Sequence, residues 1–329
     1  MHLAKSHVEI SDQSARYMDF LRRENMPHSF MFLGAPGSLK ELHAMLFAKE
    51  IIKKNDNNPH VEKKLEQSQH PDLRVLEVEP KASYHSIANI KKSMDEITLN
   101  PFESKVRVVV IFDADKMLPP AANALLKTLE EPVSSTVFIL LGSSESSFLQ
   151  TISSRCTKIL FQLFTKEQIE KQLMHEEHVS LEVARVIAKY SFGSLDAAKS
   201  LLKQTRPYPQ ELFVDFLKDL DLLSYNGFLT KFDLFDKALA KDTNLSNEEV
   251  FEIFLKWIRD VYCIGACQSE EYLYFDEEKK HLLRQSNMFT MSFDEIVELL
   301  LSIKGANLCN VKLKSCIEAL YLKLHEKST

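Results

Sequence analysis

The chain has 329 residues, a net charge of −6, 45% hydrophobic residues and 27% charged residues, which is ordinary for a soluble globular protein of two or three domains. The charge argues against a chain that binds nucleic acid over its whole surface, although a local basic face is compatible with it. Scattered cysteines without a signal peptide predict a protein of the reducing cytoplasm, and the apolar runs are too short to cross a membrane.

The first predicted elements are a helix over residues 12–23 and a strand over residues 29–33, which runs into the turn GAPGSLKE. A phosphate-binding P-loop belongs at such a turn, with the pattern G-x-x-x-x-G-K-[ST]. Gly34, Gly37 and Lys40 fit this pattern, but Leu39 replaces the second glycine and Glu41 replaces the Ser/Thr that holds Mg²⁺. A nucleotide site and a loop that only joins strand to helix are both possible, and the two replacements favour the second.

The next stretch, residues 53–69, is polar and contains no cysteine. His60 and His70 alone cannot build a tetrahedral structural metal site, so we expect a short helix or loop over residues 61–68. A strand over residues 73–79 and an amphipathic helix over residues 86–101 follow.

The most informative stretch is residues 106–156. Two short apolar runs, VRVVVIF and TVFILLG, predict buried strands of a parallel sheet over residues 106–112 and 136–142. ANALLKTLEEP between them has helical spacing and is ended by Pro132, so the three segments predict one βαβ unit. The stretch closes on TISSRC, which ends at Cys156.

The rest of the chain predicts helices. Thr165 with Gln168 forms a capping box that opens a small helical region, with helices over residues 165–177, 180–190 and 194–204. RPYPQ, residues 206–210, predicts a linker. Two further capping boxes, at residues 246–249 and 292–295, open later helices. Four cysteines at positions 263, 267, 309 and 316 lack the CxxC spacing of a metal site, and core packing is favoured for them.

ANALLKTLEEP followed by Ser154, Arg155 and Cys156 resembles the core of the bacterial clamp-loader family, the AAA+ subunits of the DNA polymerase III holoenzyme. Within that family the chain is most similar to the delta-prime branch. The resemblance implies an α/β AAA+ domain, with a parallel sheet flanked by helices and a degenerate P-loop, over residues 1–164. It also implies a small helical lid domain over residues 165–207 and a C-terminal all-helical collar domain over residues 208–329.

The resemblance also locates the parts of an ATPase site, and they are altered. Aligned from the ANALLKTLEEP helix, the family's Walker B Asp-Glu pair falls on Phe112 and Asp113, and its sensor-2 arginine falls on Asp196. Together with Leu39 and Glu41, these changes imply a non-catalytic subunit that binds no nucleotide. Delta-prime-like subunits are the members of the family that do not use ATP, so the resemblance agrees with this. No cofactor is therefore expected.

Arg155 is the part that survives. In the family, this arginine reaches across the subunit interface to a neighbour's ATP as an arginine finger, a task suited to the planar, permanently charged guanidinium. A surface salt bridge is the alternative, and the flanking Ser154 and Cys156 favour the finger. Cys156 itself is expected to be a packed residue rather than a nucleophile.

The family assembles as a hetero-pentameric ring, so the expected partners are gamma/tau-like motor and delta subunits. The sliding clamp and primer-template DNA are expected partners through the complex, and no membrane is. For the helix over residues 86–101, core packing of its apolar stripe is favoured, and the alternative that the resemblance implies is an approach to DNA inside the ring. The four-cysteine zinc module usual in the family is missing from residues 53–69, so no metal is expected. The alternative function is an active AAA+ ATPase, either a loader motor or a recombination helper, with a divergent P-loop.

Overall fold

The computed structural model describes residues 12–23, 25–79, 82, 84–97, 100–130, 135–204, 206–241, 245–267, 273–289, 291–308 and 311–326. The chain divides into two compact units, Met1–Lys199 and Ser200–Thr329. Within the described ranges, no helix is long and apolar enough to cross a membrane.

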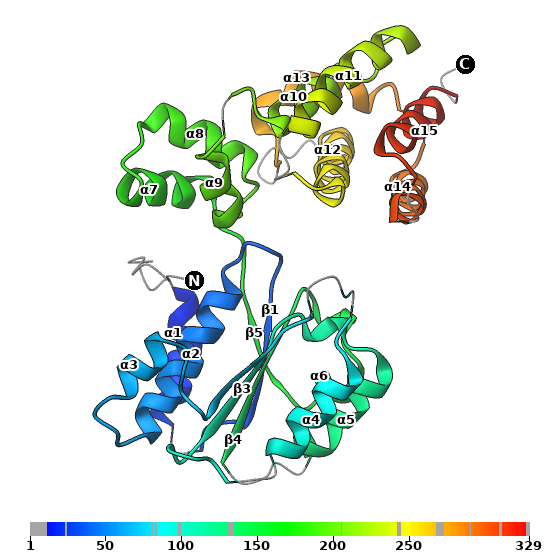
Figure 1. Ribbon diagram of the computed structural model, residues 1–329. Helices are drawn as coiled ribbons and strands as arrows, with labels where there is room; N and C mark the ends of the chain where they lie inside the picture. Colours follow the sequence, from blue (N-terminus) through cyan, green and yellow to red (C-terminus); the bar gives the residue numbers. More distant parts are fainter. Residues whose placement is uncertain are drawn as a thin grey trace. The chain divides into compact units, whose positions relative to one another are not determined.

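The first unit is built on a five-stranded parallel sheet with the order β2-β3-β4-β1-β5 (Figure 1). Its strands are β1 (Ser29–Leu33), β2 (Leu73–Leu76), β3 (Arg107–Ile111), β4 (Thr136–Gly142) and β5 (Thr157–Leu160). The strand predicted over residues 73–79 ends at Leu76, because its partner β3 ends opposite, at Ile111. β5 was not predicted, since it is short and alternately exposed, so it lacks the apolar run of the central strands.

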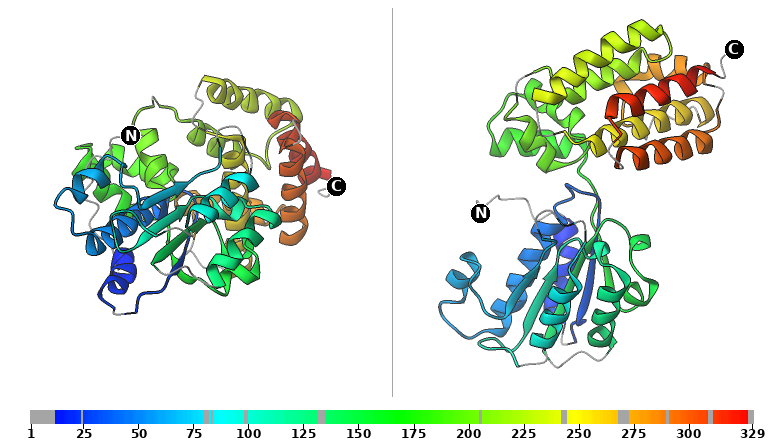
Figure 2. Two further views of the ribbon diagram at one scale, coloured as in Figure 1. Left: turned by 60° about the horizontal axis from the view of Figure 1, so that its bottom comes forward. Right: turned by 45° about the vertical axis from the view of Figure 1, so that its right-hand side comes forward.

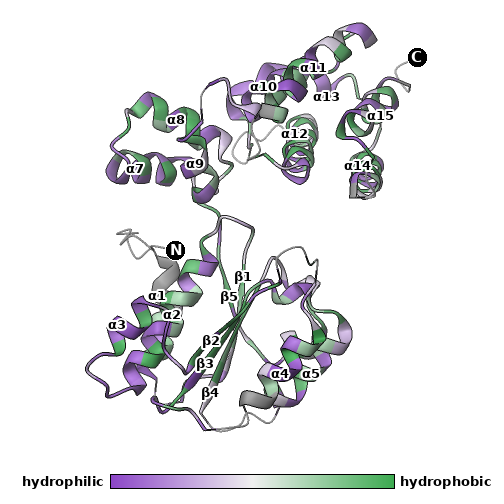
Figure 3. Cartoon of the chain, viewed as in Figure 1, coloured by the Kyte–Doolittle hydropathy of each residue, from purple (hydrophilic) through white to green (hydrophobic). Residues whose placement is uncertain are grey.

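Alternate side chains of the strands enter two separate cores, because successive residues of a strand point to opposite faces of the sheet. Phe30 and Phe32 pack into one core, and Met31 and Leu33 pack into the other. The first core is covered by α1 (Asp12–Arg22), α2 (Lys40–Asn55) and α3 (Val61–Glu66). The second is covered by α4 (Ile87–Ile97), α5 (Pro119–Glu130) and α6 (Gln150–Ser153). Figure 3 shows the apolar strands between these two helical layers. The parallel α/β fold is therefore confirmed.

The segments β3, α5 and β4 form the predicted βαβ unit, with the 3₁₀ turn η1 (Ala114–Lys116) between β3 and α5. A second 3₁₀ turn, η2 (Glu145–Ser147), follows β4. Helix α5 begins at Pro119 rather than at Ala122, because proline is tolerated in a first turn, where its missing N–H has no partner to lose.

Three helices follow the sheet: α7 (Lys166–Glu176), α8 (Leu181–Tyr190) and α9 (Leu195–Leu201). The capping box that opens α7 is confirmed, since the Gln168 N–H donates to Thr165 Oγ1 at 3.3 Å and the Thr165 N–H donates to Gln168 Oε1 at 2.9 Å. Helix α9 crosses the division between the units at Lys199. The predicted division into three domains stays a prediction.

The second unit is helical throughout its described residues, as predicted (Figure 2). Its helices are α10 (Pro209–Lys218), α11 (Tyr225–Lys241), α12 (Asn247–Cys267), α13 (Lys279–Ser286), α14 (Phe293–Leu308) and α15 (Leu313–Glu326), with a 3₁₀ turn η3 (Asp276–Glu278) before α13. Helix α12 packs against α14, which packs against α15. Pro209 and Gln210 are buried at the start of α10, so this end of the predicted linker is part of the packed unit.

The second unit contains the two capping boxes that the sequence predicted. Both capping boxes are confirmed, by the Glu249 N–H donating to Ser246 Oγ and the Glu295 N–H donating to Ser292 Oγ, with the reciprocal bonds present. Cys316 is buried. The side chain of Cys267 and the whole of Cys309 lie outside the described parts of the structure.

Candidate functional site

Residues 34–39 leave the carboxyl end of β1 and lead into α2, the place where α/β sheets usually bind ligands. The two glycines predicted for this loop are held by close neighbours. A Cβ on Gly34 would lie 2.6 Å from the Phe161 carbonyl oxygen, and a Cβ on Gly37, whose φ is +83°, would lie 2.0 Å from Ser194 Oγ. The loop is therefore packed against protein on both sides, against the residue after β5 and against the residue that precedes α9.

Leu39 has a backbone conformation that favours glycine. Its φ is +59° and its ψ is +18°, which is left-handed, and its side chain is buried directly before α2. Such a backbone costs a residue with a Cβ about 1–2 kcal/mol, whereas burying a leucine side chain gains about 1.5–3 kcal/mol. Burial can therefore offset the strain, and Leu39 holds a left-handed backbone directly before α2.

Lys40 is the residue that would reach nucleotide phosphates. Its side chain is 6% exposed, and its ammonium lies 2.7 Å from Glu41 Oε1. A second acid, Asp196, lies near Glu41. Burial, and then the negative charge of Glu41, raise the pKa of Asp196. The site thus contains one buried cation, Lys40, which is already paired with Glu41, and a second acid, Asp196. The negative charge of the two acids disfavours an incoming polyphosphate.

The residues that follow β3 are held by contacts within the chain. Phe112 packs its ring against the core under α2. Asp113 has a left-handed backbone and pairs with Lys116 at 3.2 Å. Asp115 accepts hydrogen bonds from the N–H and the hydroxyl of Ser143, at 2.9 and 2.7 Å. Both acids therefore hold local turns.

Arg155 lies in the turn between α6 and β5. Its N–H donates to the Ile152 carbonyl at 3.1 Å, and its carbonyl accepts from Ser29 Oγ at 2.7 Å, so the backbone is fixed. The guanidinium, 36% exposed, donates from Nη1 to the Thr151 carbonyl at 2.8 Å and lies with Nη2 2.7 Å from Glu130 Oε1. The predicted site residues thus form two groups, one around Lys40 and one around Arg155.

The residues around Arg155 divide into an expected and a missed part. Cys156 is buried, and burial raises the pKa of its thiol to about 11, which agrees with a packed residue rather than a nucleophile. Glu130 was not singled out in the sequence. The signal was there, because an acid in the last turn of a helix opposes the helix dipole and favours a cationic partner.

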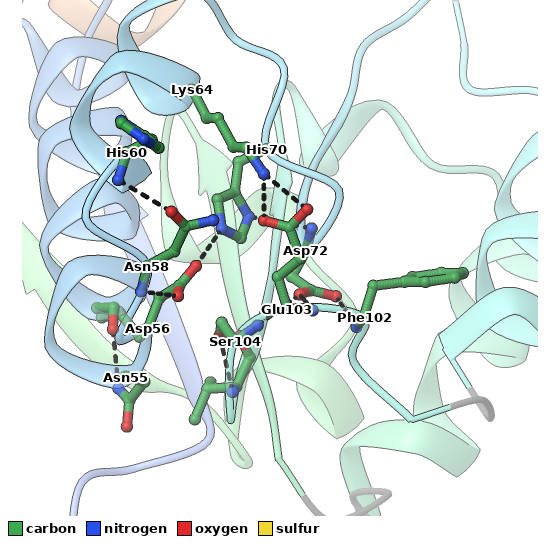
Figure 4. Close-up of polar contacts among 12 residues, drawn as sticks. Asn55, Asp56, Asn58, His60, Lys64, His70, Asp72, Phe102, Glu103 and Ser104 are labelled. Carbon is green, nitrogen blue, oxygen red and sulfur yellow. Dashed lines mark hydrogen bonds and ion pairs between the residues drawn. The ribbon is translucent and has the colours of Figure 1, made fainter.

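Asp56, His70 and Glu103 offer ligand atoms within 4.8 Å of one another (Figure 4). These atoms are already satisfied. His70 Nε2 lies 2.8 Å from Asp56 Oδ2, and Lys64 Nζ lies 2.7 and 2.6 Å from the two Glu103 oxygens. The Lys64 ammonium supplies the positive charge that a metal ion would supply, so these residues fit a charge-paired clasp better than a metal site.

Asp72 lies beside these residues and bonds to the same segment as Lys64 (Figure 4). Its buried carboxylate accepts backbone N–H groups of Phe102, Glu103 and Ser104 at 2.7, 2.8 and 2.9 Å. These bonds join the segment before β2 to the segment before β3. Lys64 of the polar stretch over residues 53–69 and Asp72 are thus both bonded to the segment that leads into β3. The expected absence of a metal stays a prediction.

A pocket of about 350 Å³ lies between β2 and the start of α4. Its lining mixes the cations Arg74 and Lys92 with Glu77 and the amide of Asn89. This is the start of the helix for which the resemblance implied an approach to DNA, and that approach stays a prediction.

Residues 11–165 match the family model described as DNA polymerase III, delta subunit. This segment is similar to that family. The resemblance to the delta-prime branch is likewise confirmed, because the whole chain is similar to DNA polymerase III subunit delta' of Bacillus subtilis (strain 168). The two are 26% identical over 337 residues, which covers 98% of this chain and 100% of that protein.

Two further similarities extend over most of the chain. DNA polymerase III subunit tau of Bacillus subtilis (strain 168) is 28% identical over 262 residues, covering 74% of this chain and 44% of that protein. Among solved structures, a DNA polymerase III gamma subunit-related protein from Thermotoga maritima is 18% identical, with a TM-score of 0.44, covering 96% of this chain and 99% of that one.

Proposed function

We propose that this protein is a non-catalytic, delta-prime-like subunit of the DNA polymerase III clamp loader, which helps to load the sliding clamp onto primed DNA. In this proposal the chain neither binds nor hydrolyses ATP. It acts on the ATP of a neighbouring motor subunit by means of Arg155. The relatives named above, a delta' subunit and a tau subunit, support a role in the clamp loader.

The observation that carries the first part is the pair between Lys40 and Glu41. A P-loop lysine must be free to meet phosphate oxygens, and here its ammonium is buried 2.7 Å from a carboxylate of its own chain. Phe112, in place of a metal-binding acid, removes a second requirement of Mg²⁺-dependent hydrolysis. These features weigh against the alternative of an active AAA+ ATPase with a divergent P-loop.

The second part depends on the exposure and chemistry of Arg155. A guanidinium with a fixed backbone and an accessible side chain can donate to phosphate oxygens of a neighbour. Arginine fingers contribute about 10³–10⁵ in rate in related GTPase systems. Arg155 would be the catalytic residue of this chain, acting in trans.

The same proposal sets the partners and the place of action. The chain would join gamma/tau-like motor subunits and a delta subunit in a hetero-pentameric ring in the cytoplasm, and would meet the clamp and primer-template DNA through that ring. Residues 1–164, 165–207 and 208–329 would act as AAA+ domain, lid and collar, with the collar as the main assembly contact.

The test is a clamp loader reconstituted with Arg155→Ala. We expect assembly to be retained, and DNA-stimulated ATP turnover to fall by about an order of magnitude or more at the site that Arg155 serves. Arg155→Lys should rescue poorly, because an ammonium restores the charge but not the planar fork.

Lys158→Ala is the matched control, because Lys158 is a similarly exposed cation close by in the sequence. It should leave the rate unchanged. Wild-type turnover and clamp loading with Arg155→Ala would refute the finger assignment.

A further inference from the structure

Glu130 holds the Arg155 guanidinium within the chain. Nη2 lies 2.7 Å from Glu130 Oε1, while Nη1 donates to the Thr151 carbonyl at 2.8 Å. These acceptors come from α5 and α6, which pack against each other. Both acceptors are therefore fixed relative to the turn that carries Arg155, and the guanidinium is folded back onto its own domain.

The helix itself does not account for an acid at this place. Glu130 is the last residue of α5, where the helix dipole disfavours a negative charge. Its side chain is 49% exposed, so it gains little from burial. Lys127 already provides a favourable charge in the last turn. What the Glu130 carboxylate does contact is Arg155.

We propose that Glu130 stands in for the neighbour's phosphate and restrains Arg155 until a correctly placed nucleotide competes for the guanidinium. The proposal rests on the proposed function of Arg155. The donor groups of a guanidinium that suit a carboxylate also suit a phosphate, so the two acceptors compete for the same nitrogen atoms.

The exchange has a direction. A polyphosphate carries more negative charge than one carboxylate, and an exposed Arg–Glu pair is weak, so a well-placed nucleotide displaces Glu130. When the neighbour is misplaced, Arg155 returns to Glu130 and the neighbouring site lacks its finger. Glu130 is thus a positioning residue that lowers turnover before clamp and DNA have ordered the ring.

The experiment places Glu130→Gln and Glu130→Ala in the reconstituted clamp loader and measures ATP turnover with and without saturating clamp and primed DNA. Without them, we expect turnover to rise about two- to fivefold, the range that a weak exposed pair allows. With them, turnover should equal that of the wild type, because Arg155 has already left Glu130.

Glu145→Gln is the matched control. Glu145 pairs with Lys158 at 2.6 Å, with side chains 50% and 38% exposed, close to the 49% and 36% of Glu130 and Arg155. Loss of this pair should change neither rate. The double variant Glu130→Gln/Arg155→Ala should behave as Arg155→Ala in both conditions, because Glu130 acts only through Arg155.

The outcomes separate this proposal from the function beneath it. If Arg155→Ala is slow but the Glu130 variants match the wild type in both conditions, Arg155 is the finger and the restraint is wrong. A fall in turnover with both Glu130 variants would also overturn the restraint, because Glu130 would then assist the finger. Wild-type rates with Arg155→Ala would refute the proposed function and the restraint with it.

Discussion

At the start of α2, Leu39 and Lys40 lie in a turn that is held by contacts within the protein. The left-handed backbone of Leu39 and the close approach of Gly37 to Ser194 preserve the turn. The Glu41 carboxylate lies 2.7 Å from the Lys40 ammonium. At this scale the difference between a nucleotide site and a structural loop rests on a few side chains.

Substitution at Leu39 separates backbone strain from side-chain burial. Leu39→Ala loses the buried side chain and keeps the left-handed cost, so we expect α2 to lose about 2–4 kcal/mol of local stability. Leu39→Gly loses the same side chain but relieves the backbone, and should be less destabilising than Leu39→Ala by about 1 kcal/mol. Native-state hydrogen exchange of the α2 amides measures both.

The control is Leu46→Ala, at an exposed leucine of the same helix, which should cost little. Equal losses for Leu39→Gly and Leu39→Ala would mean that the left-handed backbone is not strained. Neither variant should gain ATP binding, because Glu41 and Phe112 are unchanged.

At the scale of elements, the sequence predicted what depends on local pattern. The strands at residues 29–33 and 136–142 were predicted to the residue, because their apolar runs are buried on both faces. The capping box at Thr165 was predicted because it is a local pair. β5 was missed because it depends on pairing with β1 rather than on its own residues.

The candidate site shows the same limit. The replacements at Leu39, Glu41 and Phe112 were visible in a motif of fixed spacing. The pair between Arg155 and Glu130 joins positions 25 apart through the packing of α5 and α6, and the contact of Gly37 with Ser194 joins the sheet domain to a later helix. No local pattern contains such contacts.

The charge-paired clasp of Asp56, His70, Glu103 and Lys64 allows a prediction about the segment between α2 and β2. Burial tends to raise the pKa of Asp56, but hydrogen bonds from His70 and from the Asn58 N–H outweigh it, so the pKa is lowered. A lowered folded pKa means that the stabilisation is present above the ordinary value of 3.8 and is lost as the pH falls through the folded value. We expect Asp56→Asn to lower the free energy of unfolding at pH 7 by about 1–3 kcal/mol, and the loss to shrink below about pH 4.

Thermal unfolding of the variant at both pH values, with and without EDTA, is the measurement. Because Lys64 and Asp56 supply charges that pair within the protein, the chelator should not change the melting temperature of the wild type. A lower melting temperature in EDTA would show that Asp56, His70 and Glu103 hold a metal ion.

At the scale of the whole molecule, we propose that the chain has the sheet of an ATPase but does not itself use ATP. The first unit contains the five-stranded parallel sheet, and residues 11–165 match the family model. In this proposal Arg155 acts at the surface of the chain, on the ATP of another subunit. Such a function in trans requires that the chain's own site is closed to nucleotide.

Isothermal titration calorimetry of the intact, isolated chain with Mg²⁺–ATP tests that claim most directly, with a gamma/tau-like motor subunit as the positive control. The pair between Lys40 and Glu41, the charge of Asp196 and the ring of Phe112 predict no binding heat at physiological ATP concentration. A dissociation constant in the micromolar range would contradict the account and restore the reading of an active ATPase with a divergent P-loop.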